Sequence, residues 1–352
     1  MTSYERFKRM YEHKEADRVP IIDGPWATTI ERWYKEGMPA GVDWTDYFGV
    51  DKVSSIYANI SPRYMPRVVE ETDEYIIYFT EWGTTLKQQK HADSTPEFLD
   101  FTVTSPDTWK EAKAQMVPSK DRIDWTWLEN NYKQWRKDGH WVSAGFWFGF
   151  DVTHSWFVGT ETLLMGMVEE PEWCVDMFNH YLDMCIAMYD MIWDAGYTFD
   201  EIFWCDDMGF KLNQFFSLGM YRELLKPVQK RAIEWAHKKG IYTRLHSCGD
   251  IRPFVPELVS IGLDALNPME VKAGMDPFKL KADYGDKLVL HGGLNAVLWD
   301  DTEAVEAEMK KLIPIMKQNG GYIFSSDHSI PPSVSFENMT RIIELAKDLC
   351  TY

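Results

Sequence analysis

A histidine and a cysteine stand two residues apart in the stretch LHSCGD, as His246 and Cys248. The stretch ends a predicted strand, on which side chains two residues apart point to the same side of the sheet. Imidazole and thiolate are both zinc ligands, and a catalytic zinc usually takes three ligands from the protein. The spacing predicts a pair of metal ligands. It leaves open the alternative of a hydrogen-bonded histidine beside an inert, buried thiol.

Other predicted strands also end in side chains that could do chemistry. Asp206 and Asp207 are adjacent, so at most one can face inward, where it would be a general acid or base or accept a hydrogen bond from substrate. The other would cap the next helix or turn. Glu270 and His291 end two consecutive predicted strands. They are candidates for metal ligands or for an acid/base pair, although a histidine before Gly-Gly can also serve loop packing.

His328 lies in the stretch SSDHSIPPSV, where two prolines follow it. Proline restricts the backbone, so a histidine in this loop is held rigidly and could be the third metal ligand or a proton donor. Trp147 and Trp204 lie near the ends of two other predicted strands. We expect at least one ring to contact a flat or apolar part of the substrate. Core packing is the alternative for both rings.

The elements that would position these residues alternate, from about residue 140 onward, between short apolar runs and amphipathic helices. Such alternation is typical of βα units on a parallel sheet. A GxGxxG turn, which an open doubly wound sheet would favour, is not found. The predicted strands cover residues 18–23, 52–60, 141–148, 201–207, 241–247, 264–269, 287–293 and 321–326. We therefore predict an α/β fold of the (β/α)8 TIM-barrel type, in which catalytic groups lie at the carboxyl ends of the strands.

The stretch from about residue 61 to 140 breaks this rhythm. RVVEETDEYIIYFTEWGTTLKQQKH alternates as hairpin strands do, and TSPDTWKEAKAQM has the pattern of a capped helix. We predict one barrel domain over residues 1–352, with an N-terminal extension and with this hairpin/helix stretch as an inserted or lid-like subregion.

Composition and charge exclude several classes of function. A formal net charge of −18 argues against nucleic acid, an anionic membrane surface or a polyanionic substrate as a partner. No apolar run approaches the roughly 20 residues that span a bilayer, and no apolar segment of the signal-peptide type begins the chain. The five cysteines are scattered, which is typical of reduced thiols. We expect a cytoplasmic enzyme.

Several stretches together resemble one family. They are RFKRMYEHKEADRVPI, the DDMG at 206–209, LHSCGDIRPFVPELVSIGLDALNPME, LVLHGGL and GGYIFSSDHSIPPSVSFENM. These stretches resemble the uroporphyrinogen decarboxylase superfamily, and within it the branch of corrinoid- and coenzyme M-linked methyltransferases. The resemblance covers roughly residues 1–25 and 140–350, and the inserted stretch matches poorly.

This resemblance implies a (β/α)8 barrel and a zinc site. Methyltransferases of the superfamily hold zinc with a His-x-Cys pair, which His246 and Cys248 match, and with a second cysteine in a late loop. His328 stands in the place of that cysteine, so the resemblance implies a set completed by His328 or Glu270. Some O-demethylating members use glutamate and histidine ligands, which keeps His291 among the candidates.

The expected function is therefore transfer of a methyl group between a small methylated substrate, such as a methoxylated aromatic, and a corrinoid protein. No corrinoid-binding segment is apparent, so the cobalamin cofactor would arrive on that partner. Asp206 or Asp207 would hold or protonate the leaving group. The first alternative is a metal-free carboxy-lyase of the decarboxylase type. The true decarboxylases carry an arginine-rich N-terminal motif, of which only Arg32 is found nearby. The second alternative is a non-catalytic tetrapyrrole-binding module.

Overall fold

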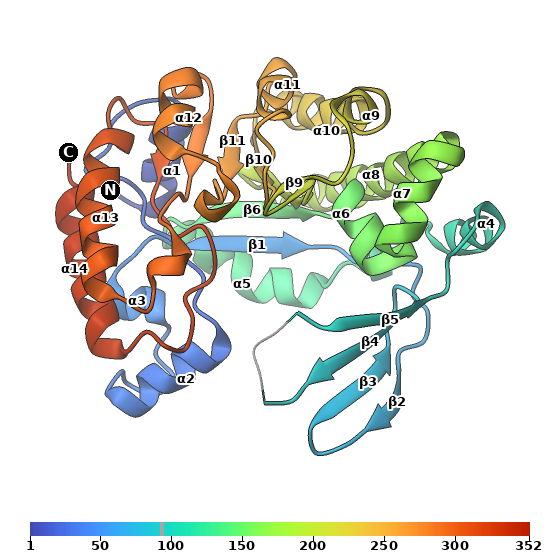
Figure 1. Cartoon of the computed structure of the whole chain (residues 1–352), viewed down its shortest axis with the longest axis horizontal. Helices are drawn as coiled ribbons and strands as arrows, with labels where there is room; N and C mark the ends of the chain where they lie inside the picture. Colours follow the sequence, from blue (N-terminus) through green and yellow to red (C-terminus); the bar gives the residue numbers. More distant parts are fainter. Residues whose placement is uncertain (92–94) are drawn as a thin grey trace.

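A curled parallel sheet forms the centre of the computed structural model, which describes residues 1–91 and 95–352. Seven strands are hydrogen-bonded in the order β1-β6-β7-β10-β11-β12-β13 (Figure 1). Their bounds are β1 Val53–Tyr57, β6 Trp141–Phe146, β7 Glu201–Cys205, β10 Tyr242–His246, β11 Ala265–Asn267, β12 Val289–His291 and β13 Tyr322–Ile323. Each lies within a stretch that the alternation of apolar runs predicts as a strand.

The segment around Ile21 closes this sheet into a barrel. Ile21 pairs with Phe324 in a parallel bridge, and the Ile22 N–H donates to the Phe324 carbonyl at 3.1 Å. On the other side, the Asp51 N–H donates to the Ile21 carbonyl at 2.9 Å, just ahead of β1. The segment predicted as a strand at 18–23 thus occupies the eighth strand position of the barrel. The predicted (β/α)8 barrel is confirmed.

Helices cover the outside of the barrel. Those that follow or precede the sheet strands are α5 Trp125–Lys137, α7 Thr160–Glu169, α8 Pro171–Asp194, α10 Lys226–Lys238, α11 Val255–Ser260, α12 Pro277–Tyr284, α13 Thr302–Met316 and α14 Phe336–Cys350. Short elements complete the loops: α6 Phe150–Thr153, α9 Leu218–Met220, the π-helical turns η2 His154–Val158 and η3 Tyr221–Leu225, the 3₁₀ turns η1 Lys120–Arg122, η4 Val271–Ala273 and η5 Ala296–Leu298, and the small hairpin of β8 Gly209–Phe210 and β9 Asn213–Gln214. Pro227 lies in the first turn of α10, whereas Pro314 lies inside α13.

The insertion predicted at about 61–140 contains a hairpin sheet and a helix. The antiparallel strands β2 Arg67–Glu71, β3 Tyr75–Phe79, β4 Thr84–Gln89 and β5 Glu97–Phe101 pair in sequence order. Helix α4, Pro106–Gln115, begins after Ser105, whose hydroxyl accepts from the Thr108 N–H as a capping box requires. Figure 1 shows this sheet projecting beside the barrel. The predicted hairpin and capped helix are confirmed.

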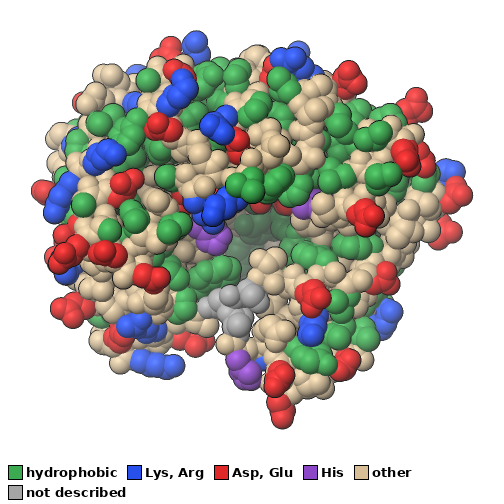
Figure 2. All heavy atoms as spheres, viewed as in Figure 1, with side chains coloured by type: hydrophobic (Ala, Val, Ile, Leu, Met, Phe, Trp, Pro, Cys, Tyr) green, Lys and Arg blue, Asp and Glu red, His purple; other side chains and the backbone are tan. Residues whose placement is uncertain are grey.

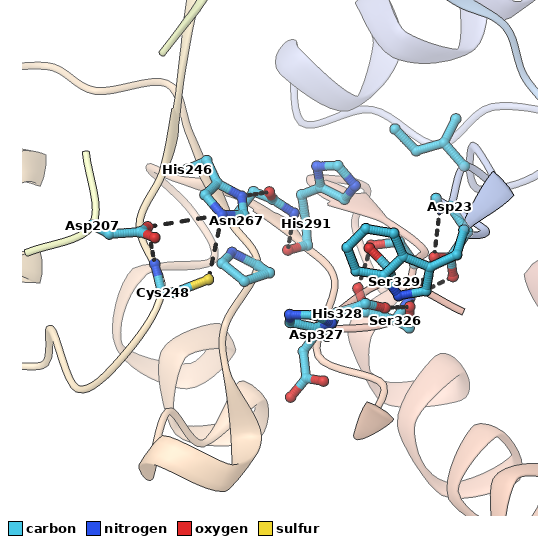
Figure 3. A pocket seen from close by; sticks show the side chains of 15 residues that line it. Asp23, Asp207, His246, Cys248, Asn267, His291, Ser326, Asp327, His328 and Ser329 are labelled. Carbon is cyan, nitrogen blue, oxygen red and sulfur yellow. Dashed lines mark hydrogen bonds and ion pairs between the residues drawn. The ribbon is translucent and has the colours of Figure 1, made fainter. Parts of the chain in front are cut away.

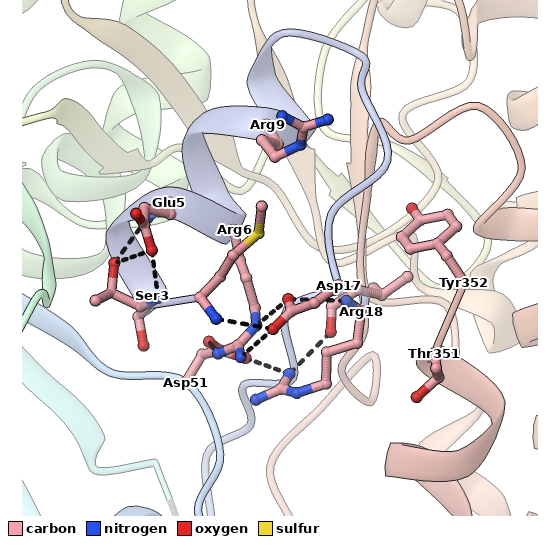
Figure 4. Close-up of polar contacts among 12 residues, drawn as sticks. Ser3, Glu5, Arg6, Arg9, Asp17, Arg18, Asp51, Thr351 and Tyr352 are labelled. Carbon is pink, nitrogen blue, oxygen red and sulfur yellow. Dashed lines mark hydrogen bonds and ion pairs between the residues drawn. The ribbon is translucent and has the colours of Figure 1, made fainter.

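An ion-pair cluster fixes the N-terminal segment, which holds α1 Ser3–Tyr11, α2 Ala27–Glu36 and α3 Trp44–Phe48. Asp51 is fully buried and accepts from Arg6 at 3.0 Å, from Arg18 at 2.5 Å and from the Ile21 N–H at 2.9 Å (Figure 4). These contacts hold the segment at 18–23 next to β1. They therefore also set the position of the loop that follows this segment, which contains Asp23. Within the described part of the chain, no helix has the length and apolar character needed to cross a bilayer.

Candidate active site

A cavity of about 440 Å³ lies at the carboxyl ends of the barrel strands. Its wall is built by residues that end the strands or lie shortly after them: Ile22–Gly24, Trp26, Asp207, His246, Cys248, Asn267, Pro268, His291 and 325–329. Figure 2 shows the surface hollowed near the middle of this face, with histidine side chains at its edge. The strand-end residues singled out in the sequence therefore meet, in large part, in one cavity.

Asp207, His246 and Cys248 form the one group of three potential metal ligands that the described residues contain, with ligand atoms within 4.8 Å of one another. The Cys248 Sγ lies 3.3 Å from the His246 Nε2, and the Asp207 Oδ1 lies 3.8 Å from the same nitrogen. Figure 3 shows the three side chains converging on one side of the cavity. One carboxylate, one imidazole and one thiol thus face a common point, as three protein ligands of a zinc ion would.

Asn267 orients the histidine of this group. Its Oδ1 lies 2.6 Å from the His246 Nδ1, and the two residues are register partners on β10 and β11. Because a carboxamide oxygen can only accept, the proton lies on Nδ1 and the lone pair of Nε2 points at the thiol and carboxylate. An outer hydrogen bond of this kind fixes the tautomer of a metal-bound histidine.

A tight turn places Cys248 beside the histidine. The Cys248 N–H donates to the Asp207 Oδ1 at 2.7 Å, and the Gly249 N–H donates to the Glu270 Oε2 at 2.5 Å. Gly249 has φ +82°, and a Cβ there would lie 2.1 Å from the backbone carbon of Gly209, so only glycine fits. Glu270 also pairs with Lys272 at 3.2 Å. Glu270 is therefore hydrogen-bonded to the turn and is not among the residues that line the cavity, and its role as a metal ligand stays a prediction.

The surroundings of Cys248 hold its thiol in the protonated form. Burial, with Asp207 and Glu270 close by, raises the pKa of Cys248 well above its usual value. A thiol in this state is a poor nucleophile and ligand at neutral pH unless a cation stabilises the thiolate. The site therefore has the donor atoms of a metal centre, and the thiolate form of Cys248 would be stabilised there by a bound cation.

The two adjacent aspartates have different environments. Asp207 lines the cavity, whereas Asp206 is fully buried and accepts from the Gln229 side chain at 2.8 Å and from the Asp151 N–H at 2.9 Å. Burial raises the pKa of Asp206 to about 8. Asp206 holds the start of α6 against α10, so the structure does not place it where it could act on a leaving group.

His291 and His328 both line the cavity, but differently. His291 is 4% exposed, and burial lowers its pKa well below the usual value, so the ring is neutral. Among the described residues, none hydrogen-bonds to its Nδ1. His328 is exposed on the rim. Neither residue belongs to the group of three ligands, and the completion of the metal set by His328 stays a prediction.

The two tryptophans that the sequence suggests as substrate contacts, Trp204 and Trp147, lie in different environments. Trp204 is fully buried and packs on Phe148 at 5.4 Å between ring centroids. Strand alternation turns it toward the helices, because its neighbour Phe203 faces the barrel interior under Arg244. The structure therefore places Trp204 in the core, away from any substrate. Trp147 is 37% exposed and lines a second cavity, with Tyr57 and Trp82.

The cavity wall also contains residues that the sequence analysis does not predict, and two of them, Asp23 and Asp327, hold the loop at 325–329 in place. Asp23, the last residue of the predicted first strand, accepts from the Ser326 N–H and hydroxyl, each at 2.8 Å. Burial raises the pKa of Asp23 to about 6. Asp327 accepts from the Val271 and Ala296 N–H groups, each at 2.7 Å. The rule that strand ends carry the chemistry could have found Asp23 and also Asn267.

The cavity wall carries three aspartates and three histidines, and none of its lining residues is Lys or Arg. A substrate with several carboxylates would find no positive partner in this wall, and carboxylates placed near carboxylates repel each other. The wall therefore favours a neutral or cationic substrate.

Replacement of Asn267 by leucine tests how the histidine is positioned. We expect the variant to fold and to bind Zn²⁺ about 10–100-fold more weakly, because the ring loses the hydrogen bond that sets its tautomer. Asn267→Asp, which keeps an acceptor at the same place, should restore most of the affinity. The measurement is competition with a metal chelator of known affinity, and equal affinities in the leucine variant and the unsubstituted protein would contradict this role.

Comparison with known proteins identifies a matching family, curated relatives and a similar solved structure. A family model described as "Uroporphyrinogen decarboxylase (URO-D)" matches residues 152–349. The chain is 30% identical over 136 residues to the uroporphyrinogen decarboxylase of Helicobacter pylori (strain P12), which is 37% of this chain and 35% of that protein. It is 34% identical over 68 residues to that of Vesicomyosocius okutanii subsp. Calyptogena okutanii (strain HA), which is 19% of this chain and 20% of the relative.

These matches span about a third or less of the relatives' own length. Among solved structures, a methyltransferase from Methanosarcina mazei superposes with a TM-score of 0.64 over 99% of both chains, at 14% sequence identity. The likeness at this identity shows that the two chains share a fold along their whole length.

Proposed function

The chain belongs to the uroporphyrinogen decarboxylase (URO-D) family, and from this premise we propose that it is a metal-dependent methyltransferase. It moves a methyl group between a small methylated substrate and a corrinoid protein that carries the cobalamin. The observation that carries the proposal is the group of Asp207, His246 and Cys248, whose three ligand atoms face one point at the mouth of the barrel.

The residues fit a zinc ion. Their donors are one oxygen, one nitrogen and one sulfur, the histidine is oriented by Asn267, and the thiol lies in a place where its anion needs a cation. In this ligand set Asp207 takes the third position that the late-loop cysteine has in similar methyltransferases. When bound, zinc would polarise the heteroatom that carries the methyl group.

The other residues of the cavity would bind the substrate and handle its proton. His291 is neutral, so its ring can donate or accept one hydrogen bond but does not bring a positive charge next to the metal. His328 is exposed at the rim, where it can exchange protons with water and pass one to the departing oxygen, nitrogen or sulfur of the substrate. The corrinoid protein would reach the same open mouth from outside.

A second candidate is a metal-free carboxy-lyase, because the curated relatives are uroporphyrinogen decarboxylases. The cavity wall speaks against it. Binding of a polycarboxylate needs cationic side chains, and the lining residues of the cavity include neither lysine nor arginine. The group of three ligands would also have no task in a reaction without metal.

The proposal is tested with the protein purified without added metal. We expect close to one zinc per chain by elemental analysis. We also expect formation of methylcobalamin, followed by its absorbance, when the protein is mixed with reduced cobalamin and a panel of methyl ethers, thioethers and amines. Metal-free protein that decarboxylates a substrate would contradict the proposal, and so would metal-loaded protein that transfers no methyl group from any member of the panel.

A further inference from the structure

A third cavity, of about 340 Å³, lies at the end of the barrel opposite the candidate active site. Tyr242 in its wall is the first residue of β10, and His246 of the metal-ligand group is the last residue of the same strand. At about 3.3 Å per residue, the strand separates them by roughly 13 Å. The rest of the wall comes from Tyr4, Lys8, Trp141, Trp193 and residues 198–200 and 239–241. None of these residues lines the mouth of the barrel, so the cavity is separate from the candidate active site.

Aromatic rings form much of this wall. Trp141 is the first residue of β6 and is 1% exposed, and its indole packs on the rings of Tyr4 and Tyr242, at 5.9 and 6.1 Å between centroids. The Trp141 Nε1 is buried and has no acceptor among the described residues. A buried donor without an acceptor costs free energy, so an acceptor atom that reached this indole would stabilise the folded protein. The wall thus offers flat apolar surface to a ring, beside an indole that lacks an acceptor.

Three polar side chains of the wall are donors without partners. Lys8 is exposed and forms no ion pair with any described residue. Glu12, which follows Lys8 by one helical turn, is already paired with Lys14 at 2.9 Å. The hydroxyls of Tyr4 and Tyr242 likewise have no hydrogen-bond partner in the described part of the chain. One ammonium and two hydroxyl groups can therefore donate to the oxygens of a ligand.

The other charges of the wall are already compensated. Asp200 accepts from the Arg136 guanidinium at 2.7 Å, and the Lys239 ammonium pairs with Asp190 at 2.7 Å. Each of these pairs has no net charge, which leaves the positive charge of Lys8 as the uncompensated charge of the cavity wall. On a chain with a formal net charge of −18, this cavity is a local exception that favours an anion.

We propose that this cavity is a second binding site, which takes a small aromatic monocarboxylate. The carboxylate oxygens would accept from Lys8 and the two tyrosine hydroxyls, and the ring would lie against the aromatic wall. A single negative charge suits the site, because the second charge of a phosphate monoester would find no further free cation and would lie near Asp200. A neutral ligand would leave Lys8 without a counter-charge. The inference is independent of the proposed function, because no residue of this wall belongs to the group of three ligands.

The test is calorimetric titration of the whole chain with four probes of similar size: 2-naphthoate, its neutral amide 2-naphthamide, the dianionic 2-naphthyl phosphate and the non-planar decahydro-2-naphthoate. We expect 2-naphthoate to bind at least about fivefold more tightly than each of the others, because it alone combines flat rings with one negative charge. Lys8→Met should weaken its binding by about tenfold or more, and Tyr242→Phe by about 3–10-fold. Lys238→Met is the matched control, since Lys238 is exposed in the last turn of α10 and does not line the cavity.

Several results would overturn this site: no detectable binding of 2-naphthoate, equal or tighter binding of any other probe, or unchanged affinity in Lys8→Met. A loss of equal size in Lys238→Met would also reject it, because the attraction would then come from surface charge in general. Lys8→Met should keep the zinc content of the unsubstituted protein, since Lys8 lies outside the metal-ligand group. Binding of 2-naphthoate to protein that neither holds zinc nor transfers methyl groups would leave this site standing and reject the proposed function alone.

Discussion

Replacement of Cys248 by alanine is expected to lower the affinity for Zn²⁺ by more than about 100-fold, beyond the ~10–100-fold that loss of an outer-shell partner causes. The reason is that Cys248 supplies the only thiolate of the group, 3.3 Å from the imidazole nitrogen, and its charge would neutralise half of that of the ion. Methyl transfer to reduced cobalamin should fall to the background rate, because the substrate heteroatom would no longer be polarised. The measurements are zinc content, chelator competition and the rate of methylcobalamin formation.

Three further variants identify the third ligand. Asp207→Ala should lower zinc affinity to a similar degree as Cys248→Ala. His328→Ala should keep full zinc content and lose rate only, because His328 is on the rim and outside the group of three. Cys205→Ala is the matched control, since it removes a neighbouring thiol that is not part of the group. Loss of zinc in His328→Ala with retention in Asp207→Ala would contradict the assignment and restore the late loop as the source of the ligand.

Replacement of Glu201 by alanine is expected to destabilise the protein by about 3–5 kcal/mol, the cost of leaving a buried charge without its partner. Glu201 is fully buried inside the barrel, where Arg244 donates to it at 2.6 Å and the Tyr11 hydroxyl donates to its other oxygen. Arg244 is 7% exposed and lies over the Phe203 ring. With Glu201 gone, its guanidinium would remain in the interior without an anion. The measurement is the free energy of unfolding from urea titration at pH 7.

The double variant Glu201→Leu with Arg244→Met provides the control, because it removes both charges and fills the space with apolar atoms. Exchanges of this kind are often neutral or stabilising, so the double variant should be more stable than Glu201→Ala. If the single variant were as stable as the unsubstituted protein, the pair would not be what holds α1 to the base of β7 and β10. Zinc affinity should change little in either variant, because the pair lies below the mouth of the barrel.

Much of the fold follows from local patterns. Apolar runs that alternate with amphipathic helices predict the parallel strands, and hairpin alternation together with the Ser105 cap predicts the insertion, because period and capping act over a few residues. The same period of two explains why the predicted pair of His246 and Cys248 faces one side. The same period predicts that only one of the adjacent residues Asp206 and Asp207 faces the barrel interior.

The rest of the site depends on contacts between distant parts of the chain. Asp207 joins His246 and Cys248 because β7 and β10 are neighbours in register, and no spacing within one segment specifies that register. Glu270 follows β11 by three residues, and its carboxylate accepts from the Gly249 N–H of the neighbouring turn. Trp204 and Trp147 both lie near strand ends, but Trp204 is buried in the core whereas Trp147 is partly exposed. This difference depends on the packing around each ring, which the local sequence does not specify.

The sequence by itself determined the barrel, the inserted sheet and the His-x-Cys pair, because each follows from a period or a spacing along one stretch of chain. The tertiary structure alone decided which third residue meets that pair and which asparagine orients the histidine. Those facts depend on strand order and register. They are set by the free energy of the whole fold, which no single segment contains.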